Sequence, residues 1–220
     1  MNVSGDEVPA TPAATVIVAR DAAAGLEVLL LRRSAVGAFA GMWVFPGGRV
    51  DPTDAGDDEL DRARHAAARE AMEEVGVRVA PAELVPFSHW TPPVSVPTRR
   101  FATWFFVAPW AGDDIAVDGH EIVEHRWLAP LQAVAAGLPL APPTWVTLHH
   151  LAAYGSLAAV QAEPPAVERY LTRPARSDGV PVLLWHGDAG YDGSTVEGPG
   201  PRHRLWMPAD GAWRYERRDA

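Results

Sequence analysis

Apolar residues gather in short runs rich in leucine or β-branched residues, and breaks rich in Gly, Pro and Asp separate these runs. Such runs between turn residues are typical of β-strands. The first two, at residues 15–20 and 26–33, are divided only by a turn-rich break and predict a hairpin. Further strands are expected at residues 84–90, 101–110 and 122–128, with shorter strand-like pieces at 180–185, 203–207 and 213–216.

One segment has the pattern of a helix. Residues 57–75 lack Gly and Pro, are rich in Ala, Glu and Arg, and stop at Gly76, in the position of a helix C-cap. Shorter helices are expected at residues 130–136 and 144–160.

Composition removes several kinds of chemistry. The chain has 220 residues, no Cys, and 19 basic residues that are all Arg. Without Lys or Cys there is no Schiff base, P-loop lysine, thiol nucleophile or disulfide. The net charge of -9 argues against a nucleic-acid polymer as partner. The N-terminus has no signal-peptide pattern and no apolar run is long enough to span a membrane, so a cytoplasmic location is expected.

A cluster of carboxylates is the main candidate for chemistry. Glu70, Glu73 and Glu74 are spaced i, i+3 and i+4, which places them on one face of the predicted helix. Such a face repels itself, and a hard divalent cation such as Mg²⁺ would relieve it. The alternative is a solvated acidic face without a ligand.

The neighbouring residues give the cluster a context. The run Phe-Pro-Gly-Gly at 45–48 precedes Arg-Glu-x-x-Glu-Glu-x-Gly at 69–76, and this pair of segments resembles the Nudix hydrolase family. The family signature is G-x5-E-x7-R-E-U-x-E-E-x-G-U, where U is a bulky aliphatic residue. Its second half is matched here, with Ala71 small for a U position. In its first half, Asp61 stands where a Glu belongs and Ala55 where a Gly belongs, so we infer an insertion of about seven residues, 51–57.

The resemblance implies a fold, a reaction and roles for residues. The fold would be an α/β/α sandwich with a mixed sheet, carrying a C-terminal helix and a short β extension. Divided by residue, it would have a flexible N-terminus at 1–12, the Nudix domain at 13–140 and an extension at 141–220 packed on that domain. The reaction would be hydrolysis of a nucleoside diphosphate derivative with Mg²⁺ or Mn²⁺. The metal ligands would be Gly47 through its carbonyl, Glu70, Glu73, Glu74 and Glu121.

The catalytic residues implied by the resemblance are Glu121, Glu70 and Arg69. Either Glu121 or Glu70 would be the base, and Glu124 is a rival to Glu121. Arg69 would orient the carboxylates by tying the helix to Asp61.

The substrate is less constrained. Pieces at 29–34, 44–51, 90–92, 100–106 and 142–144 resemble the branch of peroxisomal acyl-coenzyme A diphosphatases, which favours coenzyme A or acyl-coenzyme A. ADP-ribose or a nucleotide sugar is the alternative substrate, and a nucleotide-sensing binding module is the alternative class. Four arginines are candidates to bind the substrate phosphates: Arg32, Arg33, Arg99 and Arg100. A small-molecule nucleotide is the expected partner, a membrane is not, and a homodimer is left open.

Overall fold

The computed structural model describes residues 10–37, 39–94, 100–112, 114–193 and 195–219. The chain forms two compact units. Residues 12–89 and 103–168 form one, here called the sandwich unit, and residues up to 11, 90–102 and from 169 onward form the other, the extension unit. This division does not follow the expected boundary at residue 140, because residues 141–168 belong to the sandwich unit. The expected flexible N-terminus lies outside the described residues up to residue 9, and the first strand begins at Thr11.

The sandwich unit is built on a sheet whose centre is the predicted hairpin. Strands β1 (Thr11–Ala22) and β2 (Gly25–Arg33) pair antiparallel. The strand order is β3-β2-β1-β6-β5, with β4 paired to β1 and β7 paired to β2. The remaining strands are β3 (Trp43–Val44), β4 (Gly47–Arg49), β5 (Val85–Thr91), β6 (Phe101–Pro109) and β7 (Ile122–Leu128). The Thr11 N–H donates to the Arg100 carbonyl (2.8 Å) and the Trp110 N–H to the Ala19 carbonyl (2.8 Å), so β1 and β6 run parallel and the sheet is mixed.

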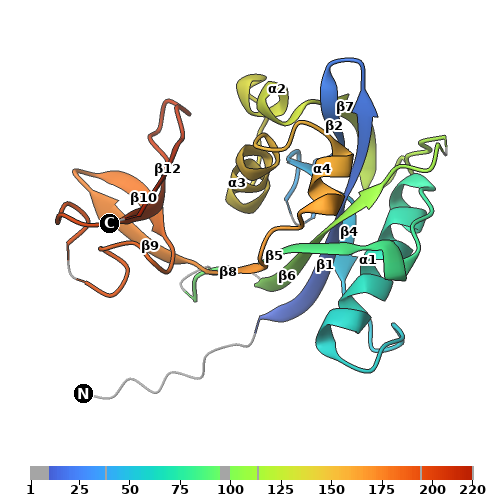
Figure 1. Ribbon diagram of the computed structural model, residues 1–220, viewed down its shortest axis with the longest axis horizontal. Coiled ribbons are helices and arrows are strands. Elements are labelled where there is room, and N and C mark those ends of the chain that lie inside the picture. The colour runs from blue at the N-terminus through green and yellow to red at the C-terminus, as the bar shows by residue number, and fades with distance from the viewer. Residues whose placement is uncertain (1–9, 38, 95–99, 113, 194, 220) are drawn as a thin grey trace. The chain divides into compact units, whose positions relative to one another are not determined.

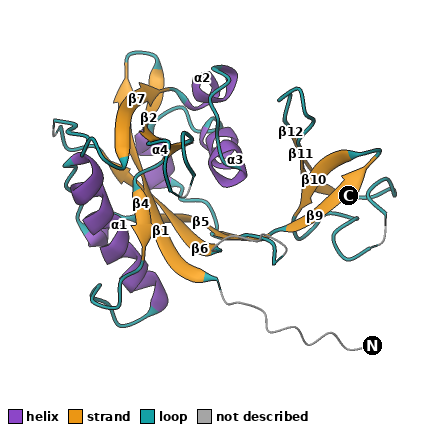
Figure 2. Ribbon diagram, turned by 180° about the vertical axis from the view of Figure 1, so that it is seen from behind, coloured by secondary structure: helices purple, strands orange, loops and turns teal. Residues whose placement is uncertain are grey.

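Both faces of this sheet are covered. Residues 13–19 of β1 are all buried, which requires a layer on each side because successive side chains of a strand point to opposite faces. Helix α1 (Glu59–Val75) lies on one face, and α2 (Pro130–Ala135) and α3 (Pro142–Leu151) lie on the other (Figures 1 and 2). The α/β/α sandwich predicted from the sequence is therefore confirmed.

Helix α1 has the ends that its sequence predicts. The Asp58 side chain caps the first turn by accepting from the Asp61 N–H (2.8 Å). Gly76 ends the helix in the left-handed conformation (φ 72°), where its N–H donates to the Met72 carbonyl (3.1 Å). Between these caps, small residues and one valine pack on the sheet: Ala63, Ala66, Ala67, Ala71 and Val75. Because Ala allows close approach, the residues beside them on α1 are held near β1 and β4.

The single helix expected at residues 144–160 is wrong. The structure has two helices, α3 and α4 (Leu157–Ala162), with Gly155 and Ser156 between them. The Ser156 hydroxyl accepts from the Ala159 N–H (3.1 Å) and starts α4 as an N-cap. In addition, the Asp21 carboxylate, at the end of β1, accepts from the Leu157 N–H (2.7 Å). A helix cannot run through a residue whose N–H is bonded in this way.

The extension unit contains a second, smaller sheet. Its order is β12-β11-β10-β9, all antiparallel. These strands are β9 (Arg173–Ser177), β10 (Val180–Leu184), β11 (Arg202–Trp206) and β12 (Arg214–Arg218), and a short strand β8 (Glu168–Leu171) precedes them. A buried ion pair between Arg204 and Asp188 (2.5 Å) lies beneath its loops. None of the helices in the described part of the chain is long and apolar enough to cross a membrane.

Candidate active site

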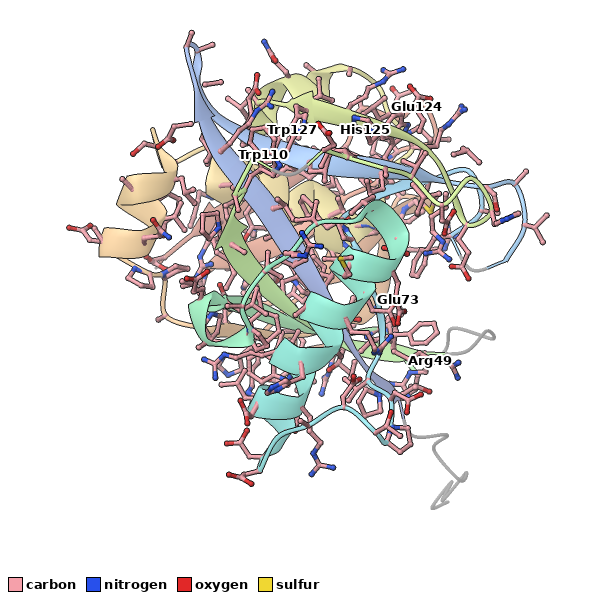
Figure 3. The ribbon with its side chains drawn as sticks, turned by 90° about the vertical axis from the view of Figure 1, so that its right-hand side faces the viewer. Arg49, Glu73, Trp110, Glu124, His125 and Trp127 are labelled. Atoms are coloured by element: carbon pink, nitrogen blue, oxygen red, sulfur yellow. The ribbon has the colours of Figure 1, made fainter. Side chains whose placement is uncertain are left out.

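Glu70, Glu73 and Glu74 lie on α1 as the sequence spacing predicts, but in different environments. The Glu74 side chain is almost fully buried, Glu70 is mostly buried, and Glu73 is exposed by more than half. Figure 3 shows α1 crossing the face of the sheet, with Glu73 near one end of the helix and Arg49 below it. The cluster is thus not an evenly solvated acidic face, since two of its three carboxylates are buried or mostly buried.

Glu74 is held by the glycine loop and by β2. Its Oε2 accepts from the Gly47 N–H (2.9 Å), and its Oε1 faces Nη1 of Arg33 (3.3 Å). Burial raises the pKa of Glu74 to about 7, although the Gly47 N–H and Arg33 both lower it, and the charges of Glu70 and Glu121 raise it further. A cation placed next to Glu74 would favour the ionised form of this carboxyl group.

Glu70 depends on the second glycine of the loop. A Cβ built on Gly48 would lie 2.4 Å from the Glu70 carboxylate, so a larger residue here would force the end of the Glu70 side chain to move. Burial raises the pKa of Glu70 above its ordinary value, while Arg69 lowers it. The Phe-Pro-Gly-Gly run therefore meets α1 through Gly47 on Glu74 and Gly48 on Glu70.

Arg69 is the counter-ion of Glu70 and Glu73. Its Nη1 donates to Glu70 Oε1 (2.8 Å) and to Glu73 Oε2 (3.1 Å). The expected tie between Arg69 and Asp61 is wrong. The other side of the Arg69 guanidinium pairs with Asp54, in the inserted segment, through Nε (2.9 Å) and Nη2 (3.1 Å). Asp61 lies in the first turn of α1, where its N–H is bonded to the cap Asp58.

Arg33 is the counter-ion of Glu74 on α1 and of Glu121 in the turn before β7. Its Nη2 donates to Glu121 Oε2 (2.6 Å), while its Nη1 faces Glu74. The Glu121 side chain is 65% exposed. Glu121 thereby joins the predicted cluster, linked to Glu74 through one arginine.

The turn that carries Glu121 is organised by Asp118, a residue that was not predicted from the sequence. The Asp118 carboxylate accepts from the N–H groups of His120 (2.7 Å), Glu121 (2.9 Å) and Ile122 (3.0 Å). Burial acts to raise the pKa of Asp118, but these N–H groups lower it to below its ordinary value. The Asp118 N–H also donates to the Glu74 carbonyl (3.2 Å), which ties the turn to the end of α1. An Asp-Gly pair just before a strand is a turn signal, and it was the available sequence clue.

The donor set can be tested against the expected divalent cation. Among the residues that the structure describes, no three carboxylate or imidazole side chains come close enough together to hold a metal ion. Instead, each of two arginines pairs with two carboxylates: Arg69 with Glu70 and Glu73, and Arg33 with Glu74 and Glu121. The groups themselves are the hard oxygen donors that Mg²⁺ and Mn²⁺ prefer, and they raise one another's pKa. They fit a divalent cation that replaces part of the arginine charge.

The remaining predicted residues are not gathered at this cluster. Arg32 pairs with Glu124 (3.1 Å), and Glu124 also faces Arg126 (2.7 Å). Figure 3 shows Glu124 on β7, apart from Glu73. Arg100 belongs to the extension unit, where its Nη2 donates to the Pro92 carbonyl (2.9 Å). Arg99 lies outside the described residues.

The chain is similar to known proteins in sequence and in fold. Residues 9–151 match the family described as the NUDIX domain. A search of the curated proteins found no match. Among solved structures, the chain is similar to a NUDIX hydrolase from Alicyclobacillus acidocaldarius, with a TM-score of 0.64 and 23% identity over 71% of this chain and 97% of that one.

Two further structures share the fold. A MutT NUDIX hydrolase from Burkholderia pseudomallei has a TM-score of 0.51 and 20% identity, over 64% of this chain and 98% of its own. The NUDIX domain of NrtR from Shewanella oneidensis, solved with ADP ribose, has a TM-score of 0.51 and 18% identity, over 64% and 86%. The predicted fold is thus confirmed, and the matches support a hydrolase. They do not distinguish the acyl-coenzyme A branch.

Proposed function

Because the chain belongs to the NUDIX domain family, we propose that it hydrolyses a diphosphate bond in a nucleoside diphosphate derivative with the help of a divalent cation. Nudix hydrolases generally use divalent metals. The observation that carries the proposal is the pairing of the glycine loop with the carboxylate helix, in which Gly47 bonds Glu74 and Gly48 leaves room for Glu70. A binding module would need no such cluster of partly buried carboxylates.

The residues that would hold the cation are Glu70, Glu73 and Glu74, with the Gly47 carbonyl as a further donor. When bound, the cation would neutralise phosphate charge and lower the pKa of a coordinated water. In the hydrolysis, a water oxygen bonds to one phosphorus, the bridging P–O bond breaks, and the water proton passes to a base. Each product keeps one of the two phosphates of the cleaved diphosphate.

Glu121 is the base that we propose. Its carboxylate is exposed to solvent, and Arg33 bonds only one of its two oxygens. A carboxylate that reaches solvent can accept a proton from a water beside a bound phosphate. Glu70 fits this role less well, because it is mostly buried between Gly48 and Arg69. Glu124 is engaged with Arg32 and Arg126 instead.

For the substrate, we propose coenzyme A or an acyl derivative, with ADP-ribose as the second candidate. The five segments that resemble acyl-coenzyme A diphosphatases support the first. The second is supported by the fold shared with a NUDIX domain that was solved with ADP ribose. It is also supported by the arginines, because ADP-ribose needs fewer positive charges to bind it than coenzyme A does. Coenzyme A carries a 3′-phosphate that ADP-ribose lacks, and Arg32 and Arg33 are both already paired with glutamates.

A substrate panel tests the proposal. The protein is incubated with Mg²⁺ or Mn²⁺ and with coenzyme A, acyl-coenzyme A, ADP-ribose, NADH, dinucleoside polyphosphates and nucleoside triphosphates, and products are identified by mass. Coenzyme A should give 3′,5′-ADP and a phosphopantetheine. Turnover of ADP-ribose with coenzyme A untouched would replace the first substrate by the second. Tight binding of one compound without turnover of any would identify a sensor and overturn the hydrolase.

A further inference from the structure

The inserted segment 51–57 forms a turn that is bonded to itself. The Asp51 carboxylate accepts from the Thr53 N–H (3.0 Å) and from its hydroxyl (2.7 Å). The Asp54 N–H donates to the Asp51 carbonyl (3.0 Å), and the Asp51 N–H donates back to Asp54 Oδ2 (2.7 Å). These reciprocal bonds fix the direction of the Asp54 side chain.

The turn is also seated against the start of α1. Gly56 has a φ of 137°, and a Cβ at this position would lie 2.5 Å from the Arg62 backbone nitrogen. Two residues later, Asp58 caps the helix. The insertion therefore packs on the first turn of α1 at one end, and its Asp54 side chain reaches Arg69, in the third turn, at the other.

Asp54 occupies one whole edge of the Arg69 guanidinium. Its Oδ1 accepts from Nε (2.9 Å) and its Oδ2 from Nη2 (3.1 Å), which is the two-bond geometry that Arg and carboxylates prefer. The Asp54 side chain is only 5% exposed. Nη2 is bonded as well to the Arg49 carbonyl (3.0 Å), so the edge formed by Nε and Nη2 is fully used.

Only Nη1 of Arg69 is left for the carboxylates of α1. Glu70 accepts from it with Oε1 and Glu73 with Oε2. Within the described part of the chain, the second oxygen of each carboxylate accepts no hydrogen bond. Each therefore keeps an oxygen with which it could bind a cation.

We propose that Asp54 is a positioning residue for the cation site, because it holds the Nε–Nη2 edge of Arg69 away from Glu70 and Glu73. Without Asp54, that edge could form a two-bond pair with either glutamate and cover the oxygens that a cation needs. This inference rests on the proposed function, since it concerns the same carboxylates. It assigns a task to the insertion that interrupts the first half of the family signature.

Mn²⁺ affinity, measured without substrate by isothermal titration calorimetry or by the loss of the free Mn²⁺ signal in electron paramagnetic resonance, tests the inference. The variant is Asp54→Asn, which keeps the shape of the side chain and removes its charge. Its Kd for Mn²⁺ should rise at least about 10-fold, as for other residues that orient metal ligands. The matched control is Asp57→Asn, in the same insertion, where the residue is exposed. Its Kd should equal that of the wild type.

A second background separates positioning from loss of loop structure. In Arg69→Gln protein there is no guanidinium edge to hold, so adding Asp54→Asn should leave the Mn²⁺ Kd unchanged. The inference is overturned if Asp54→Asn binds Mn²⁺ as the wild type does, or if it weakens binding equally in both backgrounds. Failure of the proposed function looks different. In that case the wild type binds no Mn²⁺, or binds it equally after Glu70, Glu73 and Glu74 are all changed to Gln.

Discussion

At the scale of single residues, the folded structure strongly disfavours the ionised form of the Glu74 side chain. Its pKa in the folded protein is about 7, against an ordinary value of 4.5. Between these two values the folded state keeps a proton that the unfolded chain has lost. Raising the pH through this interval therefore destabilises the metal-free protein, and above about pH 7 the loss is complete.

The pH dependence of unfolding checks this interpretation of Glu74. Relative to wild type, Glu74→Gln should become progressively more stable between about pH 5 and pH 7, by up to about 3 kcal/mol in the free energy of unfolding. The measurement is urea denaturation of metal-free protein at several pH values. Glu83→Gln is the control, since Glu83 is exposed in the short turn before β5. A difference between Glu74→Gln and wild type that stays constant with pH would contradict the interpretation.

Glu121 leads to a kinetic prediction. Glu121→Gln removes the proposed proton acceptor and should lower kcat by roughly 10²–10⁴-fold, with little change in the Kd for Mn²⁺. The reason is that Glu121 is largely exposed and lies at the edge of the carboxylate cluster. The measurement is steady-state turnover of the substrate found by the panel. An unchanged kcat, with a large loss in Glu70→Gln or Glu124→Gln, would move the role to that residue.

The sequence predicted that Glu70, Glu73 and Glu74 lie on one face of a helix. This prediction needs only their spacing and the pattern of the residues next to them in the chain. The sequence could not predict Asp54 as the partner of Arg69. The two residues are 15 positions apart, and only the hydrogen-bonded turn of the insertion brings them together. Likewise, Arg33 was predicted as a phosphate ligand, yet it bonds Glu74 and Glu121, which lie 41 and 88 positions away.

At the scale of elements, the contact between the glycine loop and α1 places Gly48 under a steric constraint. Gly48→Ala should displace the Glu70 carboxylate and weaken Mn²⁺ binding by about 10-fold or more. The backbone at Gly48 is not in the left-handed region, so the effect would come from the side chain alone. The control is Gly155→Ala, where a Cβ meets nothing within 4 Å. Wild-type affinity in Gly48→Ala would show that Glu70 moves freely.

The start of α4 gives a prediction about stability. Asp21→Ala removes the carboxylate that accepts from the Leu157 N–H and should cost about 1 kcal/mol in the free energy of unfolding. Urea denaturation measures this cost. Since Asp21 lies far from the carboxylate cluster in the sequence and bonds a different helix, the Kd for Mn²⁺ should not change. Unfolding at the wild-type urea concentration would contradict the assigned role.

The elements themselves were predicted where local signals decide. The β1–β2 hairpin follows from a turn-rich break between two apolar runs, and the end of α1 follows from Gly76. The break between α3 and α4 was missed because the segment is rich in Ala and Leu, which favour a helix, and only one glycine interrupts it. The bond from Asp21 that fixes the start of α4 spans 136 positions and leaves no trace in the local pattern.

At the scale of the whole molecule, every residue assigned to the site belongs to the sandwich unit. Five separate segments supply them: the end of β2, the glycine loop, the insertion, α1 and the turn before β7. Two arginines then divide four carboxylates into pairs, which gives the metal-free protein an internal substitute for a cation. The binding of a divalent cation at this place is therefore the central claim.

Thermal unfolding with increasing Mn²⁺ tests that claim most directly, because a ligand that binds only the folded state raises the melting temperature by linkage. The two proteins compared are the wild type and the variant carrying Glu70→Gln, Glu73→Gln and Glu74→Gln. The Tm of the wild type should rise with Mn²⁺ concentration, and the Tm of the triple variant should stay constant. An equal rise in both proteins would place the cation elsewhere and contradict the account.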